Sequence, residues 1–357
     1  MSIISNPFDH TLKLLHHPDH LNKVIHGYRP FPIHLEVDLT NVCNHACSFC
    51  NMADTLASDN TILNFDILIE RLKEAFKMGA KSISFTGGGE PTIHPKFDQI
   101  GNLCRDIGFD LGLITNGSLI KGKKLISIAE NFNWVRISLG GPDPESYKNI
   151  QGREDFHKVL ENCYELKEHH LLLKRKLNLG LKIMLTQANI EKVDKLTNCL
   201  KSHNLTSKHI DYIQFVPDQF TSDRGEFVSS NFVKQKLTSL KKELLELSIP
   251  LHGSFYSVKE EDRNLNLSSK CYAHFYQLAI TATGDITFCK NSRENSNLIV
   301  GNIIKNTFQE IWDSEKILSL EKWINASNCK SFCKSLKLNN LIHSIKNPSP
   351  DYSENFF

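Results

Sequence analysis

Short apolar segments alternate with amphipathic segments over the first two thirds of this chain. The apolar segments predict six strands, over residues 33–37, 82–85, 111–114, 135–139, 179–185 and 210–216. The segments between them, for example 65–78 and 95–107, have the periodicity of helices. Strands that alternate with helices are typical of parallel sheets with right-handed crossovers. A complete TIM barrel needs about eight such units, so the sequence predicts an α/β fold with a partial (β/α)6 TIM-like barrel of parallel strands.

The sequence changes character near Ile249-Pro250. Beyond this point, two apolar segments at 278–281 and 286–289 flank Ala-Thr-Gly-Asp, which favours a hairpin over a crossover. We therefore expect a helical lead over residues 1–30, the barrel over 31–250, a smaller C-terminal α+β hairpin module over 251–335 and a tail over 336–357. The end of the tail, from Lys346 through Asn-Pro-Ser-Pro-Asp-Tyr-Ser-Glu-Asn, is polar and broken by prolines, so this end is expected to fray.

Charge and cysteine usage restrict the possible partners. The 42 basic and 40 acidic residues leave a net charge of +2, which gives no general electrostatic reason to expect a nucleic acid or membrane partner. No apolar run of about 18 residues and no secretory signal is present, which favours a cytoplasmic protein. In a reducing compartment, clustered cysteines bind metals or act in catalysis more often than they form disulfides. Seven of the 10 cysteines fall in two such clusters.

The first cluster follows the first predicted strand. Cys43, Cys47 and Cys50 have the spacing CxxxCxxC, with Phe49 before the last cysteine. Three thiolates on one short loop can hold three corners of a cubane iron–sulfur cluster, and the fourth iron is then open to chemistry. A structural zinc site is the alternative, but it needs four ligands, usually from two paired motifs. His45 lies inside the loop and is interpreted as an exposed spacer.

This spacing resembles the signature of the radical S-adenosylmethionine (SAM) superfamily, which implies a 4Fe–4S cluster and SAM as cofactors. The resemblance extends to Gly87-Gly88-Gly89-Glu90-Pro91, directly after the second predicted strand. In the family this segment holds the methionyl ammonium of SAM, which implies that role for Gly88, Gly89 and Glu90. The alternative for Glu90 is a carboxylate that interacts with the dipole of a following helix.

Looser matches to the same family concern the rest of SAM. The resemblance implies that Ser138, on the fourth strand, lies near the ribose, and that Val216, on the sixth, lies along the adenine together with Phe49. Ordinary barrel packing is the alternative for these residues. Where family members often continue the fourth strand with Asp-Ala or Asp-Gly, this chain has Gly140-Gly141.

The second cysteine cluster lies in the C-terminal module. Cys271, Gly284 and Cys289 form the pattern Cys-x12-Gly-x4-Cys, and Cys329 and Cys333 form a CxxxC pair. This arrangement resembles the SPASM and twitch modules of radical SAM enzymes, which implies that the four cysteines hold a second, auxiliary 4Fe–4S cluster. Their number favours the smaller twitch form. Structural zinc is the alternative, because four cysteines suit it equally well.

The resemblance implies a reaction class. SAM is cleaved reductively to methionine and a 5′-deoxyadenosyl radical, which abstracts a hydrogen atom from the substrate. An auxiliary cluster with four cysteine ligands has no open iron, so we expect it to accept an electron and to permit a two-electron oxidation. An electron donor such as flavodoxin or ferredoxin is implied. The enzyme would accordingly be an oxidoreductase.

The substrate is less constrained. Related enzymes oxidise sugar-like alcohols or modify ribosomal peptides and other proteins. About 30 residues precede the barrel, too few for a leader-peptide recognition domain, which favours a carbohydrate-like small molecule over a peptide. Asp218 is the candidate base, in a polar pocket near the sixth strand with Asp211, Gln214 and Gln219. A non-enzymatic, cysteine-rich metal-binding or redox-sensing protein is the alternative from another class.

Overall fold

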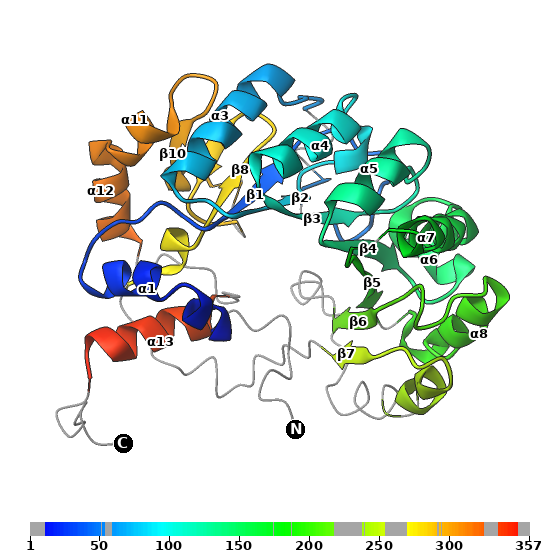
Figure 1. Ribbon diagram of the computed structural model, residues 1–357. Coiled ribbons are helices and arrows are strands. Elements are labelled where there is room, and N and C mark those ends of the chain that lie inside the picture. Colours follow the sequence, from blue (N-terminus) through cyan, green and yellow to red (C-terminus); the bar gives the residue numbers. More distant parts are fainter. Residues whose placement is uncertain are drawn as a thin grey trace.

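The computed structural model describes residues 11–50, 52–53, 59–173, 175–186, 188–217, 238, 240–253, 270–290, 293, 295–324 and 335–348. Within these residues, ten strands form one sheet in the order β10-β9-β8-β1-β2-β3-β4-β5-β6-β7. Their bounds are β1 (His34–Asp38), β2 (Ser82–Thr86), β3 (Asp110–Thr115), β4 (Trp134–Gly140), β5 (Asn178–Leu185), β6 (Tyr212–Pro217), β7 (Leu251–Gly253), β8 (Gln277–Ile280), β9 (Asp285–Thr287) and β10 (Ile299–Asn302). The sheet curves as an open arc (Figure 1).

Helices follow most of the parallel strands and lie on the convex side of this arc (Figure 1). They are α3 (Phe65–Met78), α4 (Phe97–Ile107), α5 (Lys123–Asn131), α6 (Pro144–Gln151), α7 (Phe156–Leu171) and α8 (Lys195–Ser202). Single 3-10 turns are η1 (Leu12–His16), η2 (Pro91–Ile93), η3 (Ile190–Lys192), η5 (Ala273–Phe275) and η6 (Ser296–Leu298). Further helices are α1 (Pro18–Ile25), α11 (Phe308–Trp312), α12 (Glu315–Trp323) and α13 (Leu336–Lys346), and residues 240–246 are helical as well.

Strands β1 to β7 pair in parallel, in sequence order. The predicted partial barrel of parallel strands is therefore confirmed. One difference is that residues 251–253, where the C-terminal module was expected to begin, form a seventh parallel strand beside β6. A second is that Pro18 divides the expected N-terminal helix into η1 and α1, because proline cannot donate an interior helical hydrogen bond.

Alternation along each strand separates two faces. Leu35 and Val37 of β1, like Ile83 and Phe85 of β2, are buried in the main core beneath the outer helices. The alternate residues of the strands point into the barrel, and most of them are polar. On β1, β2, β4, β5 and β6 they include Glu36, Asp38, Ser84, Arg136, Ser138, Lys182 and Gln214. The interior of the barrel can therefore receive a polar ligand.

The C-terminal module continues the same sheet. β8 pairs in parallel with β1, and β9 and β10 follow it antiparallel. The predicted hairpin is confirmed, with Gly284 at φ 83° in its turn. A second apolar core brings α1, η5 and α13 together, so the N-terminal lead packs on the C-terminal module.

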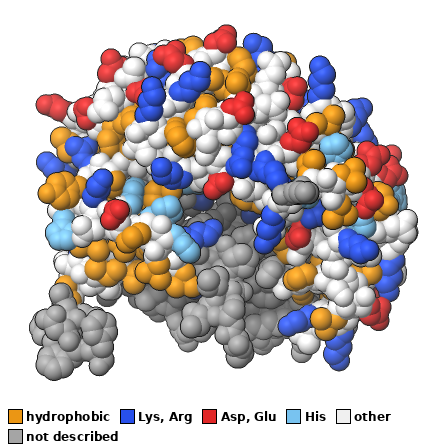
Figure 2. All heavy atoms as spheres, viewed as in Figure 1, with side chains coloured by type: hydrophobic (Ala, Val, Ile, Leu, Met, Phe, Trp, Pro, Cys, Tyr) orange, Lys and Arg blue, Asp and Glu red, His pale blue; other side chains and the backbone are white. Residues whose placement is uncertain are grey.

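The surface carries both signs of charge. Lys and Arg side chains are interspersed with Asp and Glu on the face shown in Figure 2, in keeping with the net charge of +2. Among the described residues, no helix is long and apolar enough to cross a membrane.

Candidate functional site

The loop that carries Cys43, Cys47 and Cys50 leaves the carboxyl end of β1, where a barrel of parallel strands presents its active face. All three thiols are partly exposed. The loop is fixed against the end of α6, where Ala46 N donates to Gln151 O at 3.2 Å and Ser48 N donates to Ile150 O at 2.9 Å. The backbone of the loop is therefore positioned by a helix that lies about a hundred residues later in the chain.

The three thiols lie close enough to influence one another. Burial, followed by the neighbouring Cys43 and Cys50, raises the pKa of Cys47 to about 12. In the described part of the chain, no three His, Cys, Asp or Glu side chains converge on a point that could hold a single metal ion. Each thiolate of a cubane binds a different iron, so a cubane does not need such convergence. The donor set of the loop, three cysteine thiols on one short segment, fits a cubane.

The glycine turn after β2 packs directly on this loop. Gly89 N donates to Thr40 O at 2.8 Å, and Glu90 N donates to Val42 O at 2.9 Å. A side chain on Gly89 would overlap the carbonyl oxygen of Val42. Glycine is required here because the two backbones approach so closely. The glycine turn and the first cysteine are therefore held as one unit, as a site for both the cluster and SAM requires.

Glu90 is 3% exposed and lies in this unit. Its carboxylate accepts hydrogen bonds from Thr92 N at 3.1 Å, Thr115 Oγ1 at 2.6 Å and Asn116 N at 2.8 Å. The side chain thereby caps η2, as the alternative interpretation expected, and also ties the turn to the end of β3. A role of Glu90 toward the SAM ammonium stays a prediction.

The interpretation of His45 as an exposed spacer is wrong. Its side chain is buried, and the residue is 7% exposed. Nε2 lies 3.6 Å from Asp155 Oδ2, and the ring meets Tyr147 of α6 edge-on at 6.1 Å. The imidazole turns inward because α6 and the segment after it give it an aromatic surface and a carboxylate.

The remaining predicted SAM contacts lie at the same end of the barrel. Ser138 is in β4, and its carbonyl oxygen accepts from Gln151 Nε2 at 2.5 Å. Phe49 in the cysteine loop and Val216 near the end of β6 are half-buried. Gly88 packs on Asn41, whose Oδ1 occupies the place of a Cβ. The contacts of these residues with SAM stay predictions.

Two of the four residues expected in the polar pocket near β6 are described, Asp211 and Gln214. Asp211 precedes β6, at the opposite end of the strand from the cysteine loop, where it accepts from Lys167 Nζ at 2.6 Å and Leu179 N at 2.7 Å. The prediction that Asp211 lies in this pocket is therefore wrong. Gln214 does lie on the inner face of β6, and it is buried. Asp218 and Gln219 lie outside the described residues.

Two of the four cysteines of the second cluster are described. Cys271 lies just before η5, and Cys289 follows β9. The ring of His274 stacks on Phe288 at 4.5 Å, which links the two segments, and burial lowers the pKa of His274. Cys329 and Cys333 lie outside the described residues, so ligation by all four cysteines stays a prediction.

A buried group of charges joins the second cysteine segment to the barrel interior. Lys290, the residue after Cys289, lies 2.9 Å from Glu36, and Arg293 lies 2.7 Å from Glu36 and 3.1 Å from Asp38. Burial favours the neutral form of Glu36 and by itself would raise its pKa. The positive charges of Lys290 and Arg293 outweigh this effect, so the pKa of Glu36 is lowered. Burial raises the pKa of Asp38 to about 6, although Arg293 opposes it. The sequence analysis did not predict these ion pairs.

These contacts continue to the glycine turn. A Cβ on Gly87, whose φ is 136°, would lie 2.6 Å from Asp38 Oδ1. A continuous set of contacts therefore runs from the segment after Cys289, through Arg293 and Asp38, to the turn predicted to hold SAM.

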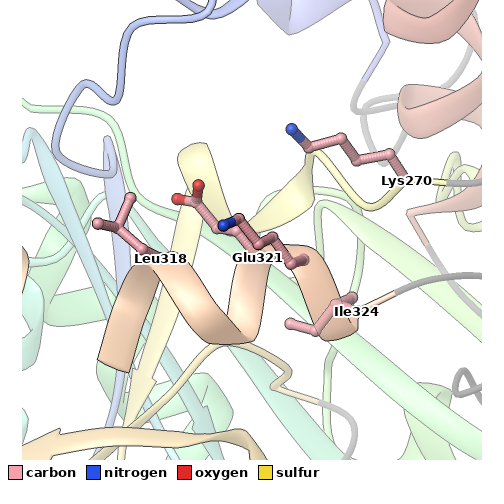
Figure 3. Close-up of a pocket in the computed structure, with 5 residues that line it drawn as sticks. Lys270, Leu318, Glu321 and Ile324 are labelled. Carbon is pink, nitrogen blue, oxygen red and sulfur yellow. The ribbon is translucent and has the colours of Figure 1, made fainter. Parts of the chain in front are cut away.

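A separate pocket of about 330 Å³ lies in the C-terminal module, lined by Lys270 and by residues of α12. Figure 3 shows Leu318 and Glu321 on α12, Ile324 directly after it, and Lys270 on the segment before η5. Glu321 is 3.6 Å from His274 Nε2 and 3.9 Å from Arg29 Nε. Lys270 directly precedes Cys271, but neither described cysteine of that cluster lines the pocket, and we assign the pocket no part in the chemistry.

Two protein-family models match the chain. The model of the radical SAM superfamily matches residues 37–194, and a model of an iron–sulfur cluster-binding domain, SPASM, matches residues 271–334. The first match spans the cysteine loop and the glycine turn. The second begins at Cys271 and spans the positions of the other three cysteines of that cluster.

Sequence relatives include two kinds of enzyme. A probable GTP 3′,8-cyclase from Sulfurisphaera tokodaii is 26% identical over 285 residues, which cover 77% of this chain and 86% of that protein. An S-adenosylmethionine-dependent nucleotide dehydratase from Selenomonas ruminantium is 31% identical over 153 residues. That match covers 42% of this chain and 54% of the dehydratase, so the chain spans about half the length of this relative.

Solved structures with the same fold include SuiB from Streptococcus suis bound to S-adenosylmethionine. Its TM-score is 0.64 at 18% identity, over 96% of this chain and 80% of SuiB. Native anSMEcpe with bound AdoMet has a TM-score of 0.58 at 19% identity, over 85% of this chain and 88% of that one. At these identities, the likeness shows the fold alone.

Proposed function

The chain is a radical SAM enzyme with a C-terminal iron–sulfur module of the SPASM type, and from this premise we propose that it oxidises a small, polar, carbohydrate-like molecule by two electrons. A 4Fe–4S cluster, SAM and auxiliary iron–sulfur chemistry belong to these two domains. We assign Cys43, Cys47 and Cys50 to the SAM-binding cluster. Cys271 and Cys289, with Cys329 and Cys333, are assigned to an auxiliary cluster.

The cofactors supply the radical chemistry. A cluster held by Cys43, Cys47 and Cys50, with SAM bound and one electron supplied, would release methionine and provide a 5′-deoxyadenosyl radical able to take a hydrogen atom from a carbinol carbon, giving 5′-deoxyadenosine. The substrate radical then loses its hydroxyl proton and one electron, and a carbonyl product remains. We propose that the auxiliary cluster accepts this electron, and that a reduced flavodoxin or ferredoxin supplies the first one.

The contact between Lys290 and Glu36 carries this proposal. It brings the residue next to Cys289 to the inner face of β1, 2.9 Å from a carboxylate of the barrel interior. An electron acceptor held by Cys289 would therefore lie next to the inner face of β1, the strand that leads into the cysteine loop. This arrangement supports an oxidation, in which an electron must leave the substrate radical.

The inner face of the barrel supports a small polar substrate. Arg136, Lys182 and Gln214 lie on neighbouring strands with Ser138, and their side chains are suited to bind hydroxyl, carboxylate or phosphate groups. The names of two sequence relatives also refer to nucleotide substrates. Asp218 is retained as the proposed base for the hydroxyl proton.

Modification of a ribosomal peptide or protein is the second candidate. SuiB is known in a structure bound to its precursor peptide SuiA, with a TM-score of 0.63 to this chain. At 18% identity that likeness shows the fold alone, so it supports a peptide substrate less than the polar interior supports a small molecule. The family matches argue against a non-enzymatic metal-binding protein.

The test begins with anaerobic reconstitution. We expect about eight irons per chain and the release of 5′-deoxyadenosine on reduction in the presence of SAM. In the matched variant C271A/C289A, we expect about half the iron, continued cleavage of SAM and no substrate oxidation. A panel of sugars, sugar nucleotides and peptides then identifies the substrate by deuterium transfer into 5′-deoxyadenosine. Transfer from a peptide alone would overturn the small-molecule assignment.

A further inference from the structure

We propose that Asp38 binds a proton when the auxiliary cluster is reduced, and that Arg293 couples the two events. Asp38 is a positioning residue in this role, because it acts on the cluster through Arg293. The inference rests on the proposed function, in which Cys289 is a ligand of the auxiliary cluster and the cluster accepts an electron. It does not depend on which substrate the enzyme oxidises.

Arg293 connects the second cysteine segment to the inner face of β1. Its Nη2 lies 2.7 Å from Glu36 Oε2, and its Nε lies 3.1 Å from Asp38 Oδ2. Burial by itself would lower the pKa of Arg293, but the negative charges of Asp38, Glu36 and Cys289 outweigh burial and raise it. One guanidinium group therefore interacts with the charge on Cys289 and with the charge on Asp38.

This group of charges is largely shielded from water. Asp38 is 1% exposed, and the side chains of Glu36, Lys290 and Arg293 are each between 13% and 15% exposed. Solvent and salt screen buried charges much less than charges on the surface. A change of charge on the cluster that Cys289 would hold is therefore transmitted to Asp38.

The neighbours of Asp38 balance its charge in the ionised form. The titratable side chains that surround it in the described part of the chain are His34, Glu36, Lys290 and Arg293. Burial lowers the pKa of His34 to about 4, so this ring is neutral near pH 7. On the side of β2, the neighbours are Thr86 and Gly87, which carry no charge. Two cations thus face two carboxylates.

Asp38 is the carboxyl group of this pair that can change its charge. Glu36 has two cations, Lys290 at 2.9 Å and Arg293 at 2.7 Å, which lower its pKa although burial opposes them. Among the described ion pairs, Asp38 has only Arg293, and burial raises its pKa to about 6. At neutral pH, Asp38 is therefore ionised but close to the range in which it binds a proton.

Reduction adds one negative charge beside Arg293. A further negative charge disfavours the ionised form of a nearby carboxyl group and raises its pKa. Asp38 then takes up a proton from the solvent, and the new O–H bond is the only covalent change that accompanies the electron. Because the reduced state binds the proton more tightly, the midpoint potential must become more negative as the pH rises above about 6. Below this pH both states are protonated, and the potential is constant.

The test is the midpoint potential of the auxiliary cluster in the reconstituted holoenzyme, followed by electron paramagnetic resonance at several pH values from about 5 to 9. The auxiliary cluster is identified by the signal that is absent from C271A/C289A and does not respond to SAM. In the wild type we expect a potential that falls with rising pH. In Asp38→Asn, which keeps the shape of the side chain and stays neutral, we expect a constant potential close to the low-pH value of the wild type.

Asp194→Asn is the matched control, because Asp194 is exposed at the start of α8 and its side chain makes no cap hydrogen bond. We expect it to retain the pH dependence of the wild type. A second measurement needs no variant: the infrared difference spectrum of the wild type, reduced minus oxidised, should contain a carboxylic acid C=O band that shifts in heavy water. This measurement remains decisive if Asp38→Asn does not assemble its clusters.

The outcomes separate this inference from the function on which it rests. A wild-type potential that does not change with pH, an equal pH dependence in Asp38→Asn, or a difference spectrum without the carboxylic acid band would overturn the role of Asp38. These results would leave the auxiliary cluster and its ligands in place. If C271A/C289A instead keeps both cluster signals, the ligand assignment in the proposed function is wrong.

Discussion

At the scale of single residues, the carboxylate of Glu90 shows how one buried side chain can fix a site. Three segments depend on it, because it accepts hydrogen bonds from η2 and from the end of β3 while its own backbone bonds to the cysteine loop. An amide in its place would direct an NH2 group at some of these donors. Substitution by glutamine therefore preserves the shape of the side chain and breaks its hydrogen bonding.

We expect Glu90→Gln to lower the free energy of unfolding by about 2 kcal/mol, since buried donors lose their acceptor. The dissociation constant of SAM should rise as well, if the carboxylate also receives the ammonium group. Thermal unfolding and calorimetric titration with SAM measure the two effects. Glu130→Gln, at an exposed position on α5, is the control and should change neither. Unaltered stability in Glu90→Gln would contradict the structural part of the prediction.

Asp38 predicts a pH dependence of stability. Its pKa is raised from 3.8 to about 6, chiefly by burial, with Arg293 opposing this rise and Glu36 adding to it. A carboxyl group whose pKa is higher in the folded state stabilises the fold below the unfolded pKa, and this stabilisation is lost as the pH rises through the folded pKa. Between about pH 4 and 7, we expect the wild type to lose about 3 kcal/mol relative to Asp38→Asn. The measurement is the melting temperature of both proteins at several pH values across this range. If the two melting temperatures change with pH by the same amount, the prediction is wrong.

At the scale of elements, the sequence predicted most strands and helices because their periodicity is local. The helix α6 was missed. Its signals were present, because Asp143-Pro144 is a start signal and Gly152 a stop signal, but the polar segment between them lacks a clear apolar stripe. The omission mattered for the site, since Gln151 and Tyr147, which contact the cysteine loop, both belong to α6.

The start of α6 offers a test of its role. Asp143 is buried, and its Oδ1 accepts from Glu145 N at 3.1 Å and Ser146 N at 3.2 Å. Asp143→Ala removes this cap and should cost about 1 to 2 kcal/mol. Because α6 supports the cysteine loop, we also expect faster hydrogen exchange in both segments. Asn is an equally good cap, so Asp143→Asn should restore slow exchange, and similar exchange in the two variants would show that the cap is unimportant.

At the scale of the whole molecule, contacts between distant parts of the chain complete the site. The cysteine loop and the glycine turn are contiguous motifs, so they could be predicted from spacing and resemblance. Glu36 and Arg293 are separated by 257 positions, and Cys47 and Gln151 by 104. Only the pairing of β8 with β1, and the packing of α6 on β4, bring these residues together, and no local pattern in the sequence encodes either contact.

Arg293 is the clearest test of the connection between the two domains. Its side chain is mostly buried and pairs with both Glu36 and Asp38 of β1. Arg293→Gln would leave two buried carboxylates with fewer positive charges, because among the described ion pairs Lys290 pairs with Glu36 and not with Asp38. Removing one partner from a buried ion pair costs about 3 to 5 kcal/mol. We expect a loss of this size in the free energy of unfolding.

The same variant separates a structural role from a functional one. If the bridge holds the auxiliary cluster beside the barrel interior, Arg293→Gln should cleave SAM at a rate near that of the wild type and yet oxidise less substrate per 5′-deoxyadenosine formed. Arg105→Gln is the control, because Arg105 pairs with Asp110 at 3.7 Å on the surface, where such a pair contributes less than about 1 kcal/mol. Full coupling of SAM cleavage to substrate oxidation in Arg293→Gln would show that electron transfer does not depend on this contact. The continuity of the sheet from β8 to β1 would then be sufficient to align the two domains.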